Sequence, residues 1–205
     1  MSNTSHKVIL IGSVGSGKTT AIQSVSEKPA ISTESKATEA DALHRKQTTT
    51  TAMDYGQLQL NGKKIHLYGA PGQRRFDFMI PVLSVGASGM IVVIDNGAEK
   101  PLEELDYYLE THRRFLQKKP TMITVTHYDD TCTKTTLFDY HQYVRERGFS
   151  LPIMIMDARK PEQVLKTLEK FIAVVEKPKI AKKTLSRLKS NNTLSTDLKT
   201  HLAFS

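Results

Sequence analysis

The sequence has one cysteine and no tryptophan among its 205 residues. A single thiol, Cys132, cannot form an internal disulfide, which fits a reducing compartment and excludes a disulfide-stabilised scaffold. No apolar run approaches the roughly 18 residues that a membrane-spanning helix needs. The opening residues MSNTSHKVILIG also lack the apolar region and cleavage site of a signal peptide, so we expect a cytoplasmic protein.

Basic and acidic residues nearly balance in most of the chain, and only the last segment has a clear excess of one sign. Residues 1–176 carry 22 Lys and Arg against 20 Asp and Glu, whereas residues 177–205 carry seven against one. A nucleic-acid-binding domain would instead spread its basic residues over its body, so we do not expect a nucleic acid partner. We expect a folded domain over 1–176 and a basic extension over 177–205, either a helix or a flexible tail. A basic extension of this kind can make peripheral contact with an anionic membrane, or remain solvated.

Short apolar runs alternate with helical patterns along the chain. Four of these runs read as buried parallel strands: 7–11, 90–94, 122–125 and 153–156. Helical patterns cover 18–26, 102–116, 137–147 and 161–175. Segments 53–60 and 64–68 flank Asn61-Gly62-Lys63, a strong hairpin signal. Together they predict an α/β fold: a mostly parallel six-stranded sheet with one antiparallel edge strand and helices on both faces.

A phosphate-binding loop is indicated by GSVGSGKTT, which lies between the first strand and the first helix. Its glycines let main-chain N–H groups converge on one point, and the helix N-terminus adds partial positive charge there. The lysine reaches the outer phosphates, and the first threonine hydroxyl binds Mg²⁺. The expected nucleotide-binding residues are Gly12, Val14, Gly15, Ser16, Gly17, Lys18, Thr19 and Thr20.

The sequence resembles the Ras-like small GTPase superfamily from Lys7 to about Val175. After the phosphate-binding loop, TTTTAMDYG resembles switch I, LYGAPGQRRF resembles switch II, and VTHYDD and MDAR stand where the family binds its base. The resemblance makes Thr50 a second Mg²⁺ ligand that senses the γ-phosphate, Gly72 the γ-phosphate-sensing glycine and Gln73 the water-positioning catalytic residue. The cofactors that it implies are GTP or GDP and Mg²⁺.

The base-binding segments keep part of the family pattern. Thr126 and His127 replace an Asn and a Lys, whereas Asp129 is retained and can accept two hydrogen bonds from guanine. The alternative is that Asp129 caps the following helix. In MDAR, we expect the main-chain N–H of Ala158 to meet guanine O6, with Arg159 beside the base.

The segments that would bind the metal and drive hydrolysis also depart from the family. Gly69 takes the place of the Asp that usually holds Mg²⁺ through water, which predicts weaker Mg²⁺ binding or binding through phosphates and waters alone. Val14 stands where many members have glycine and crowds Gln73, so we expect slow hydrolysis. Lys18 stabilises transferring charge, and Arg45 is a hypothetical arginine finger.

A narrower resemblance links the chain to the prokaryotic branch similar to the gliding-motility polarity switch, also called signal-recognition-particle-receptor-β-like. It rests on three segments: Pro-Gly-Gln in switch II, where Gly69 replaces the usual Asp; Thr-His-x-Asp; and TTTxAMDYG. It implies a bacterial GTP/GDP switch for motility, pili or polarity. The implied partner is a roadblock-type regulator or other effector at the switch regions, with recruitment to the membrane or a cell pole. Two alternatives stay open: a nucleotide-loaded adaptor that barely hydrolyses, and an ATP-using P-loop enzyme.

Overall fold

The computed structural model describes residues 4–29, 31–32, 53–129 and 135–177. The chain divides into two compact units, 1–169 and 170–205, and of the second only 170–177 are described. The expected boundary at 177 stays a prediction. Within the described ranges, no helix combines the length and apolar character that a membrane crossing requires.

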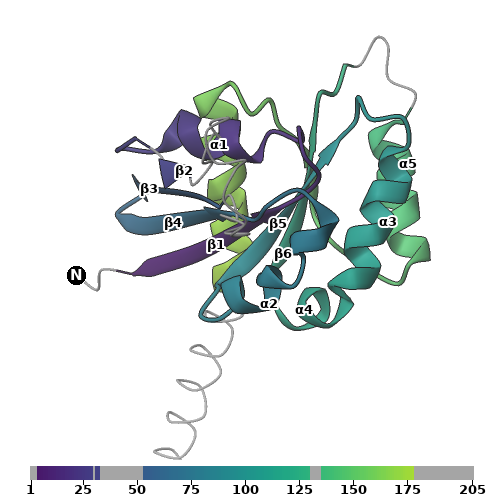
Figure 1. Ribbon diagram of the computed structural model, residues 1–205, viewed down its shortest axis with the longest axis horizontal. Coiled ribbons are helices and arrows are strands. Elements are labelled where there is room, and N and C mark those ends of the chain that lie inside the picture. Colours follow the sequence, from purple (N-terminus) through teal and green to yellow (C-terminus); the bar gives the residue numbers. More distant parts are fainter. Residues whose placement is uncertain (1–3, 30, 33–52, 130–134, 178–205) are drawn as a thin grey trace, which may run out of the picture. The chain divides into compact units, whose positions relative to one another are not determined.

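The described residues form a seven-stranded sheet in the order β2-β3-β4-β1-β5-β6-β7 (Figure 1). All neighbours pair in parallel except β3, which is antiparallel to both β2 and β4. The predicted α/β class with one reversed strand is therefore confirmed, and the two-residue β2 adds a seventh strand at the edge. The strand bounds are β1 Ser5–Ile11, β2 Ile31–Ser32, β3 Asp54–Leu60, β4 Lys63–Gly69, β5 Gly89–Asp95, β6 Thr121–Thr126 and β7 Ile153–Ile155.

The hairpin between β3 and β4 turns at Asn61-Gly62, as predicted. Both residues have positive φ angles, 50° and 72°, which a type I′ turn requires and which Asn and Gly tolerate. The turn sets a register in which Leu60 pairs with Lys63 and, at the other end, Asp54 pairs with Gly69. This register places the Asp54 carboxylate opposite Gly69, the residue that takes the place of the family's Asp.

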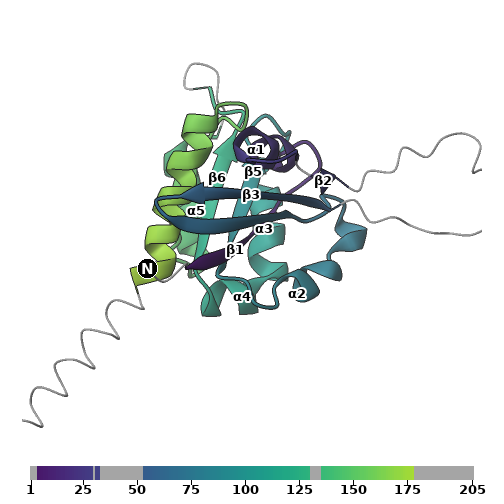
Figure 2. The ribbon, with the colours of Figure 1, turned by 90° about the vertical axis from the view of Figure 1, so that its left-hand side faces the viewer.

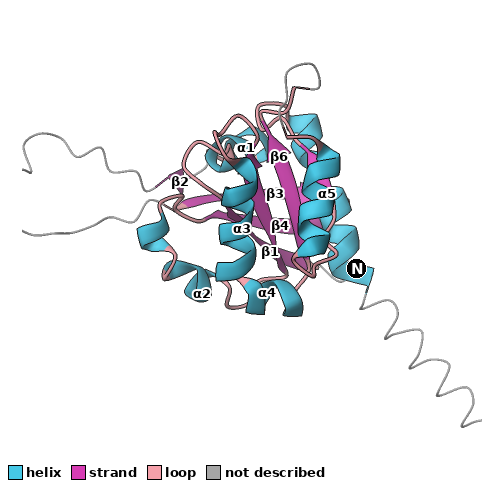
Figure 3. Ribbon diagram, turned by 90° about the vertical axis from the view of Figure 1, so that its right-hand side faces the viewer, coloured by secondary structure: helices cyan, strands magenta, loops and turns pink. Residues whose placement is uncertain are grey.

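Helices cover both faces of the sheet. In Figure 2, α1 lies above β3 and β4, and the opposite view in Figure 3 shows α2, α3, α4 and α5 over the other face. Strands β5 and β6 are almost wholly buried between these layers. The sequence of β5 is accordingly a nearly continuous apolar run, whereas β6 alternates apolar residues with buried threonines. The helix bounds are α1 Lys18–Val25, α2 Met79–Leu83, α3 Pro101–Thr111, α4 Arg113–Lys118, α5 Leu137–Glu146 and a last helix over residues 161–177.

The single helix predicted over 102–116 is wrong, because the structure has two helices, α3 and α4. The chain leaves helical geometry at His112, with φ −109° and ψ 16°. The Phe115 N–H then bonds the His112 carbonyl over three residues instead of four. The bend allows Leu109 and Leu116 to pack in the same core. The short α2 and the 3₁₀ turn η2 (Arg74–Phe76) were also not predicted.

The carboxyl ends of the parallel strands meet at one edge of the sheet. The chain continues from them into Gly12 after β1, Ala70 after β4, Asn96 after β5, His127 after β6 and Met156 after β7. In open α/β sheets the ligand site lies at this edge. The predicted site residues that the structure describes follow β1, β4, β6 and β7, end β6, as Thr126 does, or lie in the first turn of α1.

Candidate functional site

The loop between β1 and α1 has the shape that a phosphate requires. Gly12 has a φ of 151°, and a Cβ there would lie 2.1 Å from the Val93 carbonyl oxygen, so only glycine fits. Gly17 has a left-handed φ of 92° and precedes α1, which no side chain among the described residues caps. The main-chain N–H groups of the first helical turn are thus left for an anion.

Lys18 lies inside this loop, with only 6% of its surface exposed. Its ammonium donates to the carbonyl oxygens of Gly12 at 2.8 Å and Ser13 at 2.6 Å, and to the Ser16 hydroxyl at 3.4 Å. Burial lowers the pKa of Lys18 to about 8, although Asp54 and Glu104 oppose the shift. A phosphate beside this ammonium would raise that pKa again, because a nearby negative charge favours the charged form.

Thr19 faces a carboxylate that sequence reasoning missed. Its hydroxyl donates to Asp54 Oδ2 at 2.5 Å, across the gap between α1 and β3. Asp54 is the first residue of β3 and is only half-buried. Its carboxylate therefore joins the phosphate-loop threonine from a second strand.

A cavity of about 260 Å³ lies over this pair and joins the loop to the segment after β4. Gly72 packs so closely on the loop that a Cβ would lie 2.5 Å from the Val14 nitrogen. Gln73 is exposed and lines the cavity together with Val14, which is 68% exposed. The lining residues are Val14, Gly15, Gly17, Lys18, Thr19, Thr20, Asp54, Ala70, Pro71, Gly72, Gln73 and Phe76.

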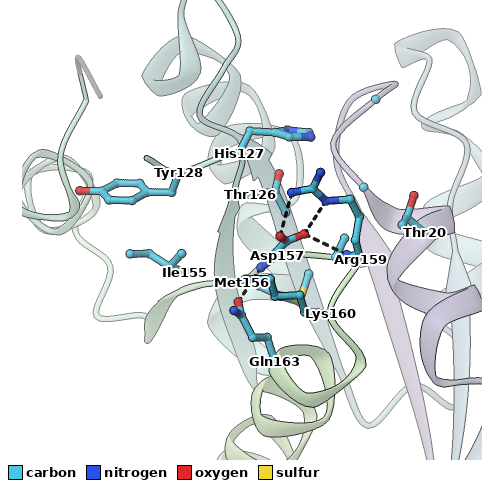
Figure 4. A pocket seen from close by; sticks show the side chains of 13 residues that line it. Thr20, Thr126, His127, Tyr128, Ile155, Met156, Asp157, Arg159, Lys160 and Gln163 are labelled. Carbon is cyan, nitrogen blue, oxygen red and sulfur yellow. Dashed lines mark hydrogen bonds and ion pairs between the residues drawn. The ribbon is translucent and has the colours of Figure 1, made fainter. Parts of the chain in front are cut away.

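A second cavity of about 300 Å³ begins where the first ends, because Gly15, Gly17 and Thr20 line both. Figure 4 shows its walls, with Thr20 on one side and Tyr128 and Ile155 on the other. It is also lined by Thr126, His127, Met156, Asp157, Ala158, Arg159, Lys160 and Gln163. Thr126, His127 and Tyr128 of the predicted base-binding segment VTHYDD thus lie together with the segment MDAR, next to the phosphate loop.

Thr126 joins the two halves of the site. It is buried, and its hydroxyl lies 3.0 Å from the Ser16 carbonyl oxygen and 3.2 Å from that of Ile94. In addition, a Cβ on Gly17 would lie 3.7 Å from the Thr126 methyl group and 3.0 Å from the Ala158 Cβ. A threonine therefore ties the phosphate loop to the base-binding strand where the resembled family has an asparagine.

His127 is held at the mouth of the second cavity. It has a positive φ of 50°, and its Nδ1 lies 2.7 Å from Asp95 Oδ1, at the end of β5. The same carboxylate oxygen accepts from the Gly97 N–H at 2.8 Å. Sequence reasoning missed Asp95, which orients the imidazole beside the space for a base.

The loop after β7 is fixed by Asp157. Its carboxylate accepts from Arg159 Nε and Nη2, both at 2.9 Å, and from the Arg159 N–H at 3.0 Å. These bonds lower the pKa of Asp157 to about 2. The Asp157 N–H in turn donates to Gln163 at 2.8 Å (Figure 4). Ala158, the residue expected to meet guanine O6, lies between these anchored neighbours, whereas the Arg159 head group is engaged with Asp157.

The remaining predicted residues either line neither cavity or lie outside the described residues. Asp129 is exposed, two residues after His127, and is not among the residues that line the two cavities. The alternative that it caps the next helix is wrong, because the N-cap of α5 is Thr136, which forms a capping box with Asp139. Arg45, Thr50 and Cys132, like the basic segment 178–205, lie outside the described residues.

The residues present suit Mg²⁺ in part. Thr19 and Asp54 offer a hydroxyl and a carboxylate, and oxygen is the ligand that this ion prefers. Among the described residues, no three His, Cys, Asp or Glu side chains gather closely enough to hold a metal alone. The other ligands would have to be phosphate oxygens and waters, which Mg²⁺ accepts.

Comparison with known proteins agrees with this geometry. Residues 7–129, more than half of the chain, match the family described as Ras of Complex, Roc, domain of DAPkinase. A stretch of 109 residues is 38% identical to an uncharacterised protein of Methanocaldococcus jannaschii and covers 52% of this chain. It covers 63% of that protein, so the chain spans less than two thirds of its relative's length. Because the match spans more than half of the chain and includes the loop between β1 and α1 and the segment after β4, the chain belongs to the Ras-like GTPases of the Ras-of-complex (Roc) family.

Proposed function

We propose that the protein is a molecular switch that binds GTP and GDP and hydrolyses GTP slowly. The observation that carries this proposal is the cavity shared by Lys18 and Thr19 of the phosphate loop and by Gly72 and Gln73 of the segment after β4. A phosphate group bound at the loop would therefore contact that segment directly. Loss of the terminal phosphate would therefore alter the contacts of Gly72 and Gln73, which is how such a switch changes its surface.

Guanine selection is assigned to the second cavity and to Asp129. A carboxylate accepts two hydrogen bonds from guanine N1–H and the exocyclic amine, whereas adenine offers no such pair. The main-chain N–H of Ala158 would meet O6, and His127, held by Asp95, would lie against the base.

Charge and metal binding are assigned to the first cavity. Lys18 would bind the outer phosphates by exchanging its carbonyl partners for phosphate oxygens. Mg²⁺, when bound, neutralises charge on the phosphates, with Thr19 as a ligand and Thr50 proposed as a second one. Slow hydrolysis is supported by Val14, because its branched side chain lines the same cavity as Gln73 and would crowd a water there. Arg45 remains the proposed arginine finger.

Partner binding is assigned to the switch segments. Phe78, Val82 and Val85, after Gln73, are 68%, 71% and 74% exposed, and exposed apolar side chains in one segment are typical of interaction sites. The resemblance to the gliding-motility branch supports a roadblock-type partner and a role in motility, pili or polarity. In that proposal the basic extension recruits the protein from the cytoplasm to the membrane or a pole.

The nucleotide that co-purifies with the protein tests this function. Denaturation would release it, chromatography would identify it, and turnover of added GTP would then be followed over hours. We expect GDP or GTP and slow turnover, faster with a partner. ATP or ADP would contradict the guanine assignment and favour a P-loop enzyme that uses adenine nucleotides. Bound GTP without turnover, with or without a partner, would favour the adaptor.

A further inference from the structure

The resembled family has a metal-site Asp at the position of Gly69, at the end of β4, whereas here the nearby carboxylate, Asp54, belongs to β3. Gly69 ends β4 and has no side chain to offer. Its direct partner across the antiparallel ladder is Asp54. Because directly opposed residues of an antiparallel pair project from the same face, Asp54 points to the side to which a residue 69 side chain would point.

Asp54 also occupies the space of such a side chain. A Cβ built on Gly69 would lie 3.1 Å from Asp54 Cβ and 3.2 Å from Asp54 Oδ2. A carboxylate from β3 and one from β4 would therefore crowd the same volume. The glycine at 69 is what leaves room for Asp54 to lean over the end of β4.

The carboxylate of Asp54 reaches the phosphate loop. Its Oδ2 accepts from the Thr19 hydroxyl at 2.5 Å, and Asp54 lines the same cavity as Lys18. This is the side of the loop where the outer phosphates and their cation belong. An acidic oxygen bonded to the Thr19 hydroxyl is placed to hold both that hydroxyl and a metal-bound water.

We propose that Asp54 supplies the metal-site carboxylate that Gly69 lacks, so that the acidic group has moved from β4 to its partner strand β3. The proposal rests on the proposed function, since the metal accompanies a nucleotide. It replaces the expectation that Mg²⁺ is left to phosphates and waters. Asp54 acts as a positioning residue, which orients Thr19 and the water shell of the ion.

The test measures how fast a fluorescent GDP analogue dissociates as free Mg²⁺ is varied from micromolar to millimolar. In the parent protein we expect Mg²⁺ to slow release. In Asp54→Asn, which keeps the size and loses the charge, half-maximal slowing should need at least about tenfold more Mg²⁺, as for other residues that orient metal ligands. Asp106→Asn, on α3 and paired with Arg147, removes a carboxylate outside both cavities and should match the parent.

A swap of the two positions sharpens the test. Asp54→Gly alone should need more Mg²⁺ than the parent, and the double variant Asp54→Gly with Gly69→Asp should recover most of the loss, because the carboxylate returns from β4 and no Cβ at position 54 crowds it. Gly69→Asp alone should destabilise the fold, since it crowds Asp54 and Ile22. A double variant that is folded but no better than Asp54→Gly would overturn the equivalence of the two positions.

The outcomes separate the two proposals. If the parent binds the GDP analogue but Asp54→Asn keeps the parent's Mg²⁺ dependence, the role of Asp54 is wrong and the switch remains. If the parent binds guanine nucleotide with release that ignores Mg²⁺, the role of Asp54 is likewise overturned. If the parent binds no guanine nucleotide, both proposals fail.

Discussion

The Thr126 hydroxyl lies 3.0 Å from the carbonyl oxygen of Ser16, a residue 110 positions earlier in the chain. This contact joins the end of β6, where the predicted base-binding segment begins, to the predicted phosphate-binding loop. Its place in the site makes Thr126 a structural link between the two cavities.

Replacement of Thr126 by Val should weaken both the fold and nucleotide binding. Val has nearly the same shape but loses the hydroxyl that contacts the Ser16 and Ile94 carbonyl oxygens, and the loss of a buried hydrogen bond costs about 1–3 kcal/mol of unfolding free energy. Urea unfolding and the release rate of a fluorescent GDP analogue would measure the two effects. Thr124→Val is the matched control, because Thr124 is buried on the same strand, makes only a 3.5 Å contact with Val92 and does not touch the phosphate loop. Equal release rates in the two variants would contradict the link.

Asp129→Asn should change which base the protein prefers. An amide in place of the carboxylate loses the acceptor pair for guanine, but its NH₂ can donate to the C2 oxygen of xanthine. We expect affinity for GDP to fall by at least about 10²-fold and affinity for xanthosine diphosphate to rise, since lost hydrogen bonds in a polar site are costly. Competition binding measures both. Unchanged preference for GDP would mean that Asp129 does not contact the base.

Lys18 should make stability depend on pH when nucleotide has been removed. Its pKa of about 8 in the fold lies below its ordinary 10.5, so the unfolded chain binds more protons above pH 8. Stability therefore rises with pH there, at up to about 1.4 kcal/mol per pH unit, relative to Lys18→Met. Urea unfolding of both proteins from about pH 7 to about pH 9.5 measures the difference. Parallel curves would show that the Lys18 charge costs nothing in the fold.

Gly72→Ala should disturb the contact between the switch segment and the phosphate loop. The added methyl group would lie 2.5 Å from the Val14 nitrogen and 2.7 Å from the Ser13 carbonyl carbon, and main-chain atoms cannot rotate away. We expect a loss of about 1–3 kcal/mol in unfolding free energy, as for other overpacked sites. Gly97→Ala is the control, because its nearest neighbour is the Asp95 side chain at 3.1 Å, which can adjust. A variant as stable as the parent would show that Gly72 is not confined there.

Val14→Gly should speed GTP hydrolysis by opening the space around Gln73. Gln73→Ala should lower single-turnover hydrolysis by about 10²-fold, since a misplaced nucleophile costs that much. Combining the two changes should remove the gain from Val14→Gly. Both single variants should bind GDP as the parent does. A Val14→Gly protein no faster than the parent would assign the slow rate to another cause.

The sequence predicted the parts of the fold that depend on local pattern. Strands such as β5, and the Asn61-Gly62 turn, carry their signal in a few consecutive residues. The bend at His112 left no such signal, because it depends on how Leu109 and Leu116 reach one core. Prediction therefore succeeded on local periodicity and failed on packing between helices.

For the site, the phosphate loop and the base-binding segments were found by motif, and the cavities bring them together. Asp54 was missed because it acts across a strand pair. A signal existed: the two-residue turn fixes a register that sets Asp54 opposite Gly69. Asp95 and Asp157 had no comparable signal, since each acts by orienting a neighbour, His127 or Arg159.

The Asn61-Gly62 turn limits which insertions and deletions the chain can tolerate. It lies exposed at the far end of the hairpin from Asp54, where a change of loop length usually costs little. Here, one residue gained or lost would shift β3 against β4 and point Asp54 away from the phosphate loop. A length change at this turn could thus leave the protein folded yet change its response to Mg²⁺.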